Sequence, residues 1–154
     1  MAGRRAPAAA GRTAEVDLQE RMIALIRAFG LHKPDQTPCG RPVSVAEAHA
    51  LIELSRAETL VQKELASRLR LEKSTVSRLV GMLEDRGWVE RSRSPQDGRA
   101  LELRLTEAGK RTAENIAEAR RAKFAQILEA IPEEERESVL ESMRILEEAM
   151  SESE

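Results

Sequence analysis

The stretch "EKSTVSRLV", residues 72–80, combines an apolar stripe with small hydroxyls and one guanidinium. Together with Leu83, its apolar residues hold positions i, i+3, i+4 and i+7, which is one face of an α-helix. At about 100° per residue, Ser74, Ser77 and Arg78 fall on the opposite side. Hydroxyls bind base edges or phosphates, and a guanidinium can bind guanine O6 and N7 together. The pattern predicts a helix whose outer face carries mainly small side chains, so that it can enter the major groove of double-stranded DNA.

A second helix is expected immediately before this one. The segment "QKELASRL" places Leu65, Ala66 and Leu69 on one side, and "LRLEK" supplies a tight turn into the stretch above. Gly87 is well placed to end the later helix, because glycine readily adopts the left-handed conformation found there. Two short helices joined by a tight turn predict a helix-turn-helix, whose second helix reads DNA.

Two short segments of strand character follow. "WVERSR" and the alternating "ALELRL" flank "SPQDG", which is rich in turn formers, so a two-stranded hairpin is predicted. Asp97 and Arg99 lie near its tip, where a basic turn can follow the DNA backbone or enter the minor groove. Arg91 and Arg93 are two residues apart and share a face. They either contact DNA or pair with neighbouring carboxylates, and the sequence favours neither.

Taken together, "KSTVSRLV", "LEDRGWVER", the "DGR" turn and "LTEAG" within residues 62–109 resemble the MarR family of bacterial winged-helix transcriptional regulators. The resemblance implies a homodimer that places one winged helix on each half of an inverted-repeat operator, is more often a repressor, and is released by a small ligand in many members. It places Asp97 so that it orients the wing arginine. The predicted DNA-binding set is Lys73, Ser74, Thr75, Ser77 and Arg78 on the recognition helix, with Arg91, Arg93, Asp97 and Arg99 on the wing.

The chain of 154 residues has room for one domain with helical extensions. The predicted fold class is mainly α with a small two-stranded β-wing, a winged helix-turn-helix plus N- and C-terminal dimerisation helices. Residues 1–13 are expected to form a disordered basic arm, 44–109 the DNA-binding domain, 14–33 and 110–150 the helical dimerisation region, and 151–154 an acidic tail. The apolar stripe Val139, Met143, Leu146 and Met150 calls for a partner helix.

Composition excludes several other classes of function. The net charge is −2, yet ten cations and seven carboxylates lie between Gln62 and Arg104, a local charge of +3 that suits a nucleic acid. Aromatic residues make up only 2% of the chain, too few for the stacking platforms of single-strand binders. No phosphate loop, nucleophile elbow or metalloprotease helix is present, so we predict neither an enzyme nor a cofactor. No apolar run could span a bilayer and no secretory leader is evident, so a cytoplasmic protein is expected.

Two alternatives stay open at this level. The thiol of Cys39 and the imidazoles of His32 and His49 could bind a metal or act as a redox sensor, although a loop thiol and two structural histidines explain the same residues. The winged helix could also serve as a protein-interaction module. Only DNA binding is expected to weaken steeply with salt, because phosphate contacts release counterions.

Overall fold

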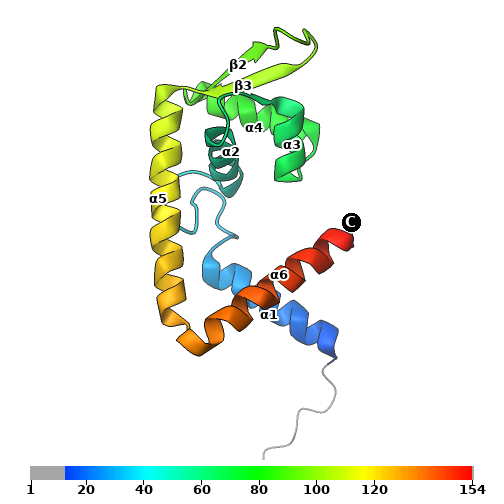
Figure 1. The fold of residues 1–154 in the computed structure, drawn as a ribbon, viewed down its shortest axis with the longest axis vertical. Coiled ribbons are helices and arrows are strands. Elements are labelled where there is room, and N and C mark those ends of the chain that lie inside the picture. Colours follow the sequence, from blue (N-terminus) through cyan, green and yellow to red (C-terminus); the bar gives the residue numbers. More distant parts are fainter. Residues whose placement is uncertain (1–12, 154) are drawn as a thin grey trace, which may run out of the picture. The chain divides into compact units, whose positions relative to one another are not determined.

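The computed structural model describes residues 13–153, and the chain divides into two compact units between Val45 and Ala46. Within the described residues, none of the helices combines the length and the apolar character needed to cross a bilayer. Figure 1 shows the order of the elements along the chain.

The first unit contains helix α1, Ala14–Phe29, and the loop after it. The helix ends at Gly30, whose φ of +90° lies in the left-handed region that glycine adopts without strain. In the proline-rich loop, the buried Thr37 hydroxyl accepts a hydrogen bond from the Arg41 N–H at 3.0 Å. No residue of α1 is buried, so its apolar side chains contribute little to the core of this chain.

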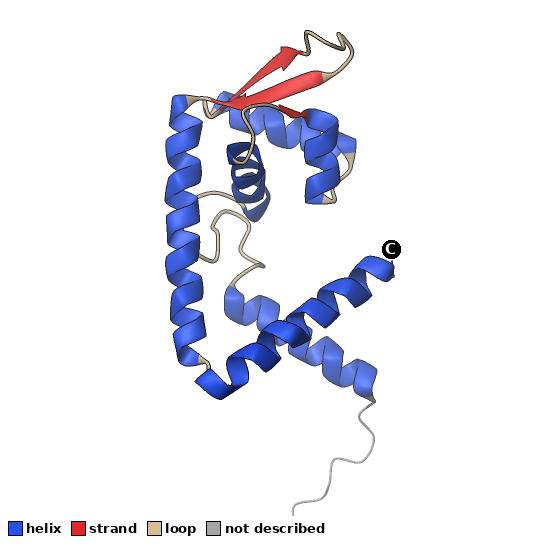
Figure 2. Cartoon of the chain, viewed as in Figure 1, coloured by secondary structure: helices blue, strands red, loops and turns tan. Residues whose placement is uncertain are grey.

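The second unit carries the remaining elements, which alternate short helices with a small sheet before two long helices (Figure 2). They are α2 (Val45–Ser55), β1 (Leu60–Val61), α3 (Gln62–Leu69), α4 (Lys73–Asp85), β2 (Val89–Arg93), β3 (Leu101–Leu105), α5 (Glu107–Ala130), the 3₁₀ turn η1 (Glu133–Glu135) and α6 (Arg136–Glu152). The predicted helix-turn-helix corresponds to α3 and α4, and the predicted wing to β2 and β3.

The sheet has one strand more than the two predicted. Its order is β1-β3-β2 and both pairings are antiparallel, with Leu60 opposite Leu103 and Val89 opposite Leu105. The additional strand is only two residues long and leads directly into α3, so it leaves no alternating pattern in the sequence. It matters because it joins the start of the helix-turn-helix to the wing.

The core lies between α2, α3, α4, the sheet and the first half of α5. The largest side chains that are fully buried there are Leu51, Leu65, Val76, Val80, Leu83, Leu103 and Ile116. Burying a side chain of this size contributes about 1.5–3 kcal/mol each, so this cluster holds the recognition helix and the wing in one unit. The four apolar positions predicted for residues 76–83 are all buried.

The end of α4 is fixed by backbone hydrogen bonds at Gly87, as predicted. Gly87 has a φ of +72° and its N–H donates to the Glu84 carbonyl, while the Trp88 N–H donates to the Leu83 carbonyl. This pair of bonds is the Schellman arrangement, which satisfies the last helical carbonyls and turns the chain into β2. Next to it, the Arg86 guanidinium lies 4.8 Å from the centre of the Trp88 ring and pairs at 3.1 Å with the buried carboxylate of Glu47 on α2.

The start of α5 packs directly against this turn. The Thr106 hydroxyl donates to the Gly87 carbonyl at 2.6 Å and accepts from the Gly109 N–H at 3.0 Å, and the Thr106 N–H donates to the Trp88 carbonyl at 3.0 Å. A Cβ at Gly109 would lie 2.0 Å from the Trp88 carbonyl oxygen. Only glycine therefore permits α5 to approach the turn this closely.

We predict that Gly109→Ala lowers the free energy of unfolding by about 1–3 kcal/mol, because the new methyl group clashes with backbone that cannot easily move. Gly81→Ala is the matched control, since nothing lies within 4 Å of the Cβ that it adds to α4. The control should raise stability by about 0.8 kcal/mol through helix propensity. Urea denaturation followed by circular dichroism measures both, and equal effects of the two substitutions would contradict the close approach.

Candidate nucleic-acid interface

Helix α4 has a buried apolar side and an open polar side. Val76, Leu79, Val80 and Leu83 are buried, whereas Lys73, Ser74, Ser77 and Arg78 are exposed and Thr75 is half-buried. The open side carries no aromatic residue and its first two turns carry no carboxylate, although the exposed Glu72 lies just before the helix begins. This is the polar face with small side chains that the sequence predicts.

The wing tip is closed by its own hydrogen bonds. The buried Ser94 hydroxyl accepts from the N–H groups of Gln96 and Asp97, and the Asp97 carboxylate accepts from the Arg99 N–H at 3.0 Å. Asp97 thus holds the backbone of the arginine rather than its guanidinium. The Arg99 side chain is left exposed at the tip.

The two strand arginines share a face of the sheet, but Arg91 is half-buried whereas Arg93 is exposed. Arg91 lies opposite the buried Leu103 in the sheet register, and its guanidinium donates to Glu84 on α4, with an Nε to Oε2 distance of 3.1 Å, and to Gln62 at 3.4 Å. Arg93 donates to the Gly98 carbonyl at 2.8 Å, which braces the tip. The sequence left two interpretations open for these arginines, DNA contact and pairing with a carboxylate. The contacts of Arg91 support the pairing with a carboxylate.

The cations of the winged helix fall into three groups. Arg70 and Arg93 donate to uncharged oxygens, those of the Ser151 hydroxyl and the Gly98 carbonyl. Arg68, Arg86 and Arg91 are paired with carboxylates. Among the residues that the structure describes, no carboxylate lies within ion-pair distance of Lys63, Lys73, Arg78, Arg99 or Arg104. Four of these five line the open side of α4, the wing tip or the groove between them. Their positive charge is available to an external anion.

A groove of about 300 Å³ lies between the wing and the helix-turn-helix. Lys63 and Gln62 from α3, Lys73 from α4 and Arg99 from the wing all line it. Lys63 and Gln62 are absent from the predicted DNA-binding set, because the apolar positions of α3 predict its buried side and do not show what its polar side contacts. The signal that could have found them is the polar outer face of "QKELASRL".

The three candidate sensing residues are divided between the two units. His32 and Cys39 lie in the loop of the first unit, exposed and half-buried respectively, whereas His49 lies on α2 in the second unit and is exposed rather than core-facing. Burial of part of the ring, followed by the charge of Arg120, lowers the pKa of His49, while Glu53 opposes this shift. Among the residues that the structure describes, no three His, Cys, Asp or Glu side chains are arranged to hold a metal.

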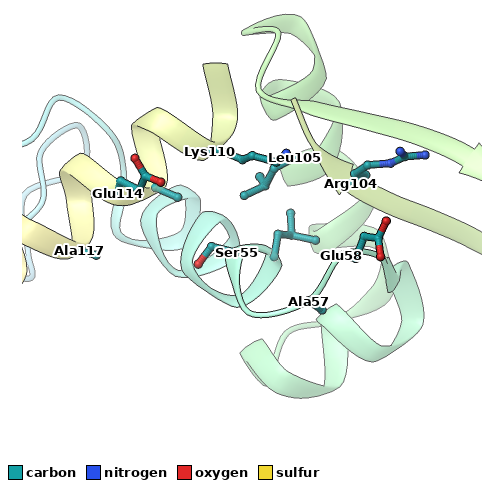
Figure 3. A pocket seen from close by; sticks show the side chains of 10 residues that line it. Ser55, Ala57, Glu58, Arg104, Leu105, Lys110, Glu114 and Ala117 are labelled. Atoms are coloured by element: carbon teal, nitrogen blue, oxygen red, sulfur yellow. The ribbon is translucent and has the colours of Figure 1, made fainter. Parts of the chain in front are cut away.

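A second cavity, of about 420 Å³, lies on the side of the core next to α5. Figure 3 shows side chains from the end of α2 and the following turn, from β3 and from the first half of α5 around it. Apolar groups such as Leu54, Leu105 and Ala113 form part of its wall, with Glu58 and Arg104 at its edge. The lining suits a small molecule with both apolar and charged parts.

Comparison with known proteins agrees with this arrangement. Residues 42–100 match the model of the MarR family. The chain is 30% identical over 108 residues to YfiV of Bacillus subtilis, an HTH-type transcriptional regulator, covering 70% of this chain and 68% of the relative. Among solved structures, PcaV of Streptomyces coelicolor with its natural ligand has a TM-score of 0.74 at 22% identity, covering 92% of this chain and 99% of PcaV. The MepR–DNA complex of S. aureus has a TM-score of 0.73 at 22% identity, with 86% and 97% covered.

A helix-turn-helix whose second helix presents hydroxyls and a guanidinium beside a basic hairpin defines a winged-helix, DNA-binding transcriptional regulator. Within that class, this chain belongs to the MarR family. The fold class expected from the sequence is therefore confirmed, with the short third strand as an addition.

We predict that Arg91 stabilises the wing and makes little contribution to DNA affinity. Because its side chain and that of Glu84 are only 23% and 33% exposed, their pairing should survive moderate salt. A double-mutant cycle of Arg91→Gln and Glu84→Gln should give a coupling of about 0.5–1 kcal/mol in the free energy of unfolding. Zero coupling, or a loss of duplex affinity as large as that of an Arg78 variant, would show that Arg91 acts on DNA.

Proposed function

We propose that this regulator binds double-stranded operator DNA in the cytoplasm through the outer face of α4 and the tip of the wing, as a binding protein rather than an enzyme. Lys73, Ser74, Thr75, Ser77 and Arg78 enter the major groove, and Arg99, with Arg93 and Asp97 shaping the tip, contacts the backbone or the adjacent minor groove. The observation that carries this proposal is the free charge of Lys73, Arg78 and Arg99 beside neighbouring arginines that are paired.

Selection of bound fragments from random duplex DNA tests this function directly. A regulator of this kind should enrich an inverted repeat whose half-sites are separated by about one helical turn, roughly 10 base pairs, or a multiple of it. The affinity should fall steeply as salt rises. If no duplex binds at low salt, the winged helix serves as a protein-interaction module instead.

We predict that Arg78→Ala costs about 1–3 kcal/mol in operator affinity and relaxes base preference at one position, since a bidentate contact to a guanine is lost. Arg99→Ala should weaken binding to all sequences more evenly, because the wing contacts mainly the backbone or groove shape. Neither substitution should change the melting temperature, as both side chains are exposed. Fluorescence anisotropy on the selected duplex measures the change, and unaltered affinity in both variants would rule out the assigned roles.

We also propose a homodimer that represses by occupying its operator. On α6 no residue is buried, and Leu140, Met143, Ile145 and Met150 are each at least half exposed. Leu18 and Leu25 on α1 and Phe124 on α5 are about half exposed as well. Ile116, by contrast, is buried in the chain's own core. Such a density of exposed apolar side chains is typical of surfaces that a second subunit covers.

We predict that Met143→Glu raises the dissociation constant of the dimer about 100-fold or more, because an unpaired carboxylate buried in an apolar interface costs several kcal/mol. Ser138→Glu adds the same charge on α6 away from the stripe and should leave the dimer intact. Light scattering across a concentration series measures both variants. A parent chain that is monomeric at micromolar concentration would contradict the proposed assembly.

Release by a small effector remains a proposal of the same kind. The cavity between α2, β3 and α5 supports it, because its wall includes the start of α5, which contacts the turn between α4 and the wing. A ligand that alters this contact would move the DNA-binding face. A compound shown by NMR to bind at Ala57 and Ala113, yet without effect on duplex affinity, would exclude release through this cavity.

Redox sensing through Cys39 is the alternative. It predicts that peroxide alters the duplex affinity of the parent but not that of Cys39→Ser.

A further inference from the structure

Two grooves adjoin on the surface of the helix-turn-helix. One runs between α3 and the wing, and the other follows the turn between α3 and α4. Both are lined by Lys63, Ala66 and Lys73, so these residues form the boundary that the grooves share. The pair extends from Arg70 at the turn to Arg99 on the wing.

The charge along these grooves is mainly positive. Lys63, Arg70, Lys73 and Arg99 line them, against the carboxylates of Asp97 and Glu72. The Asp97 carboxylate already accepts a hydrogen bond from the Arg99 N–H, which partly satisfies its negative charge. Arg70 donates to the Ser151 hydroxyl at 3.0 Å and not to a carboxylate.

Lys63 has no carboxylate partner among the described residues, and the carboxylates of the neighbouring helical surface pair with other cations. Glu64 accepts from Arg68 one turn further along α3 at 2.6 Å, and Arg68 also reaches Glu53 on α2 at 3.4 Å. No described carboxylate lies within ion-pair distance of the Lys63 ammonium group. An exposed lysine of this kind is a point charge, which suits a phosphate oxygen better than the planar edge of a base.

The position of the grooves identifies the anion. They lie between the start of the recognition helix and the wing, the two elements proposed above to contact one duplex. The sugar-phosphate strand between those contacts must cross this surface. A duplex also supplies a negative charge every few ångströms along its length, which matches several cations in a row.

We propose that the two grooves form a channel for the DNA backbone and that Lys63 binds a phosphate in it. The inference rests on the proposed function and extends it to α3, outside the recognition helix and the wing. Lys63 positions the duplex and does not read its sequence, because phosphate contacts fix register without distinguishing bases.

The test compares Lys63→Gln with the parent on the selected operator and on an unrelated duplex. Arg56→Gln is the control, since it removes one positive charge from the exposed end of α2, outside both grooves. Loss of one phosphate contact should reduce the slope of log affinity against log salt by about 0.9 per subunit. Between 50 and 200 mM salt, the parent should therefore lose about 3.5-fold more affinity per subunit than Lys63→Gln. The loss should be equal on both duplexes, and the control should keep the parent slope.

A second arm locates the contact and separates a DNA phosphate from free phosphate. In a series of operators, each has a single phosphate replaced by a neutral methylphosphonate. At one position the replacement should weaken binding by the parent but should not further weaken binding by Lys63→Gln. Inorganic phosphate, compared with chloride at equal ionic strength, should not displace the parent more than the variant. Unchanged slope in a folded Lys63→Gln protein, or selective displacement by inorganic phosphate, overturns the channel while DNA binding by the parent still stands. A parent that binds no duplex overturns the proposed function and the channel with it.

Discussion

The contact between the start of α5 and the turn after α4 is the constraint on which the rest of the second unit depends. The chain brings the backbone of Trp88 so close to Gly109 that a side chain at that position would overlap the carbonyl oxygen. Thr106 adds two hydrogen bonds across the same junction, from its hydroxyl to the Gly87 carbonyl and from its N–H to the Trp88 carbonyl. Because the turn also begins β2, this one contact sets the direction of the recognition helix, the wing and the long helix together. A change at the start of α5 is therefore expected to move the turn, and with it the end of α4 and the beginning of the wing.

Pairing of charges divides the basic residues of the winged helix by role. Arg86 and Arg91 reach carboxylates on other elements, Glu47 and Glu84, and thereby connect α2, α4 and the sheet. Of the cations without such partners, Lys63, Lys73, Arg78 and Arg99 lie where the polar face of α4 meets the wing, whereas Arg104 lines the cavity next to α5. The same residue type thus stabilises the fold in one place and, under the proposed function, supplies charge for DNA binding in another. The difference lies in the partner and not in the side chain.

Helices α1 and α6 differ from the elements between them in how little of their surface is buried. Helices α1 and α6 bury none of their residues, although both carry regular apolar stripes. Free energy from the hydrophobic effect is available there only if another surface covers them. This is the physical basis for proposing a dimer, and it explains why the stable core of the chain is confined to α2–α4, the sheet and the beginning of α5.

By itself, the sequence determined the elements with strong local signals: the apolar period of residues 76–83, the glycine that ends α4, and the turn of the wing. These features depend on residues within about one turn of each other, so their pattern is visible in one dimension. The tertiary structure alone decided the rest. The two-residue strand β1 has no period to detect, and the partner of Arg91 is seven residues away on another element. The core decides which distant segments lie together. It therefore also decides which cations find a carboxylate partner and that Lys63 lies beside Lys73 and Arg99, because charge interactions act through space and not along the chain.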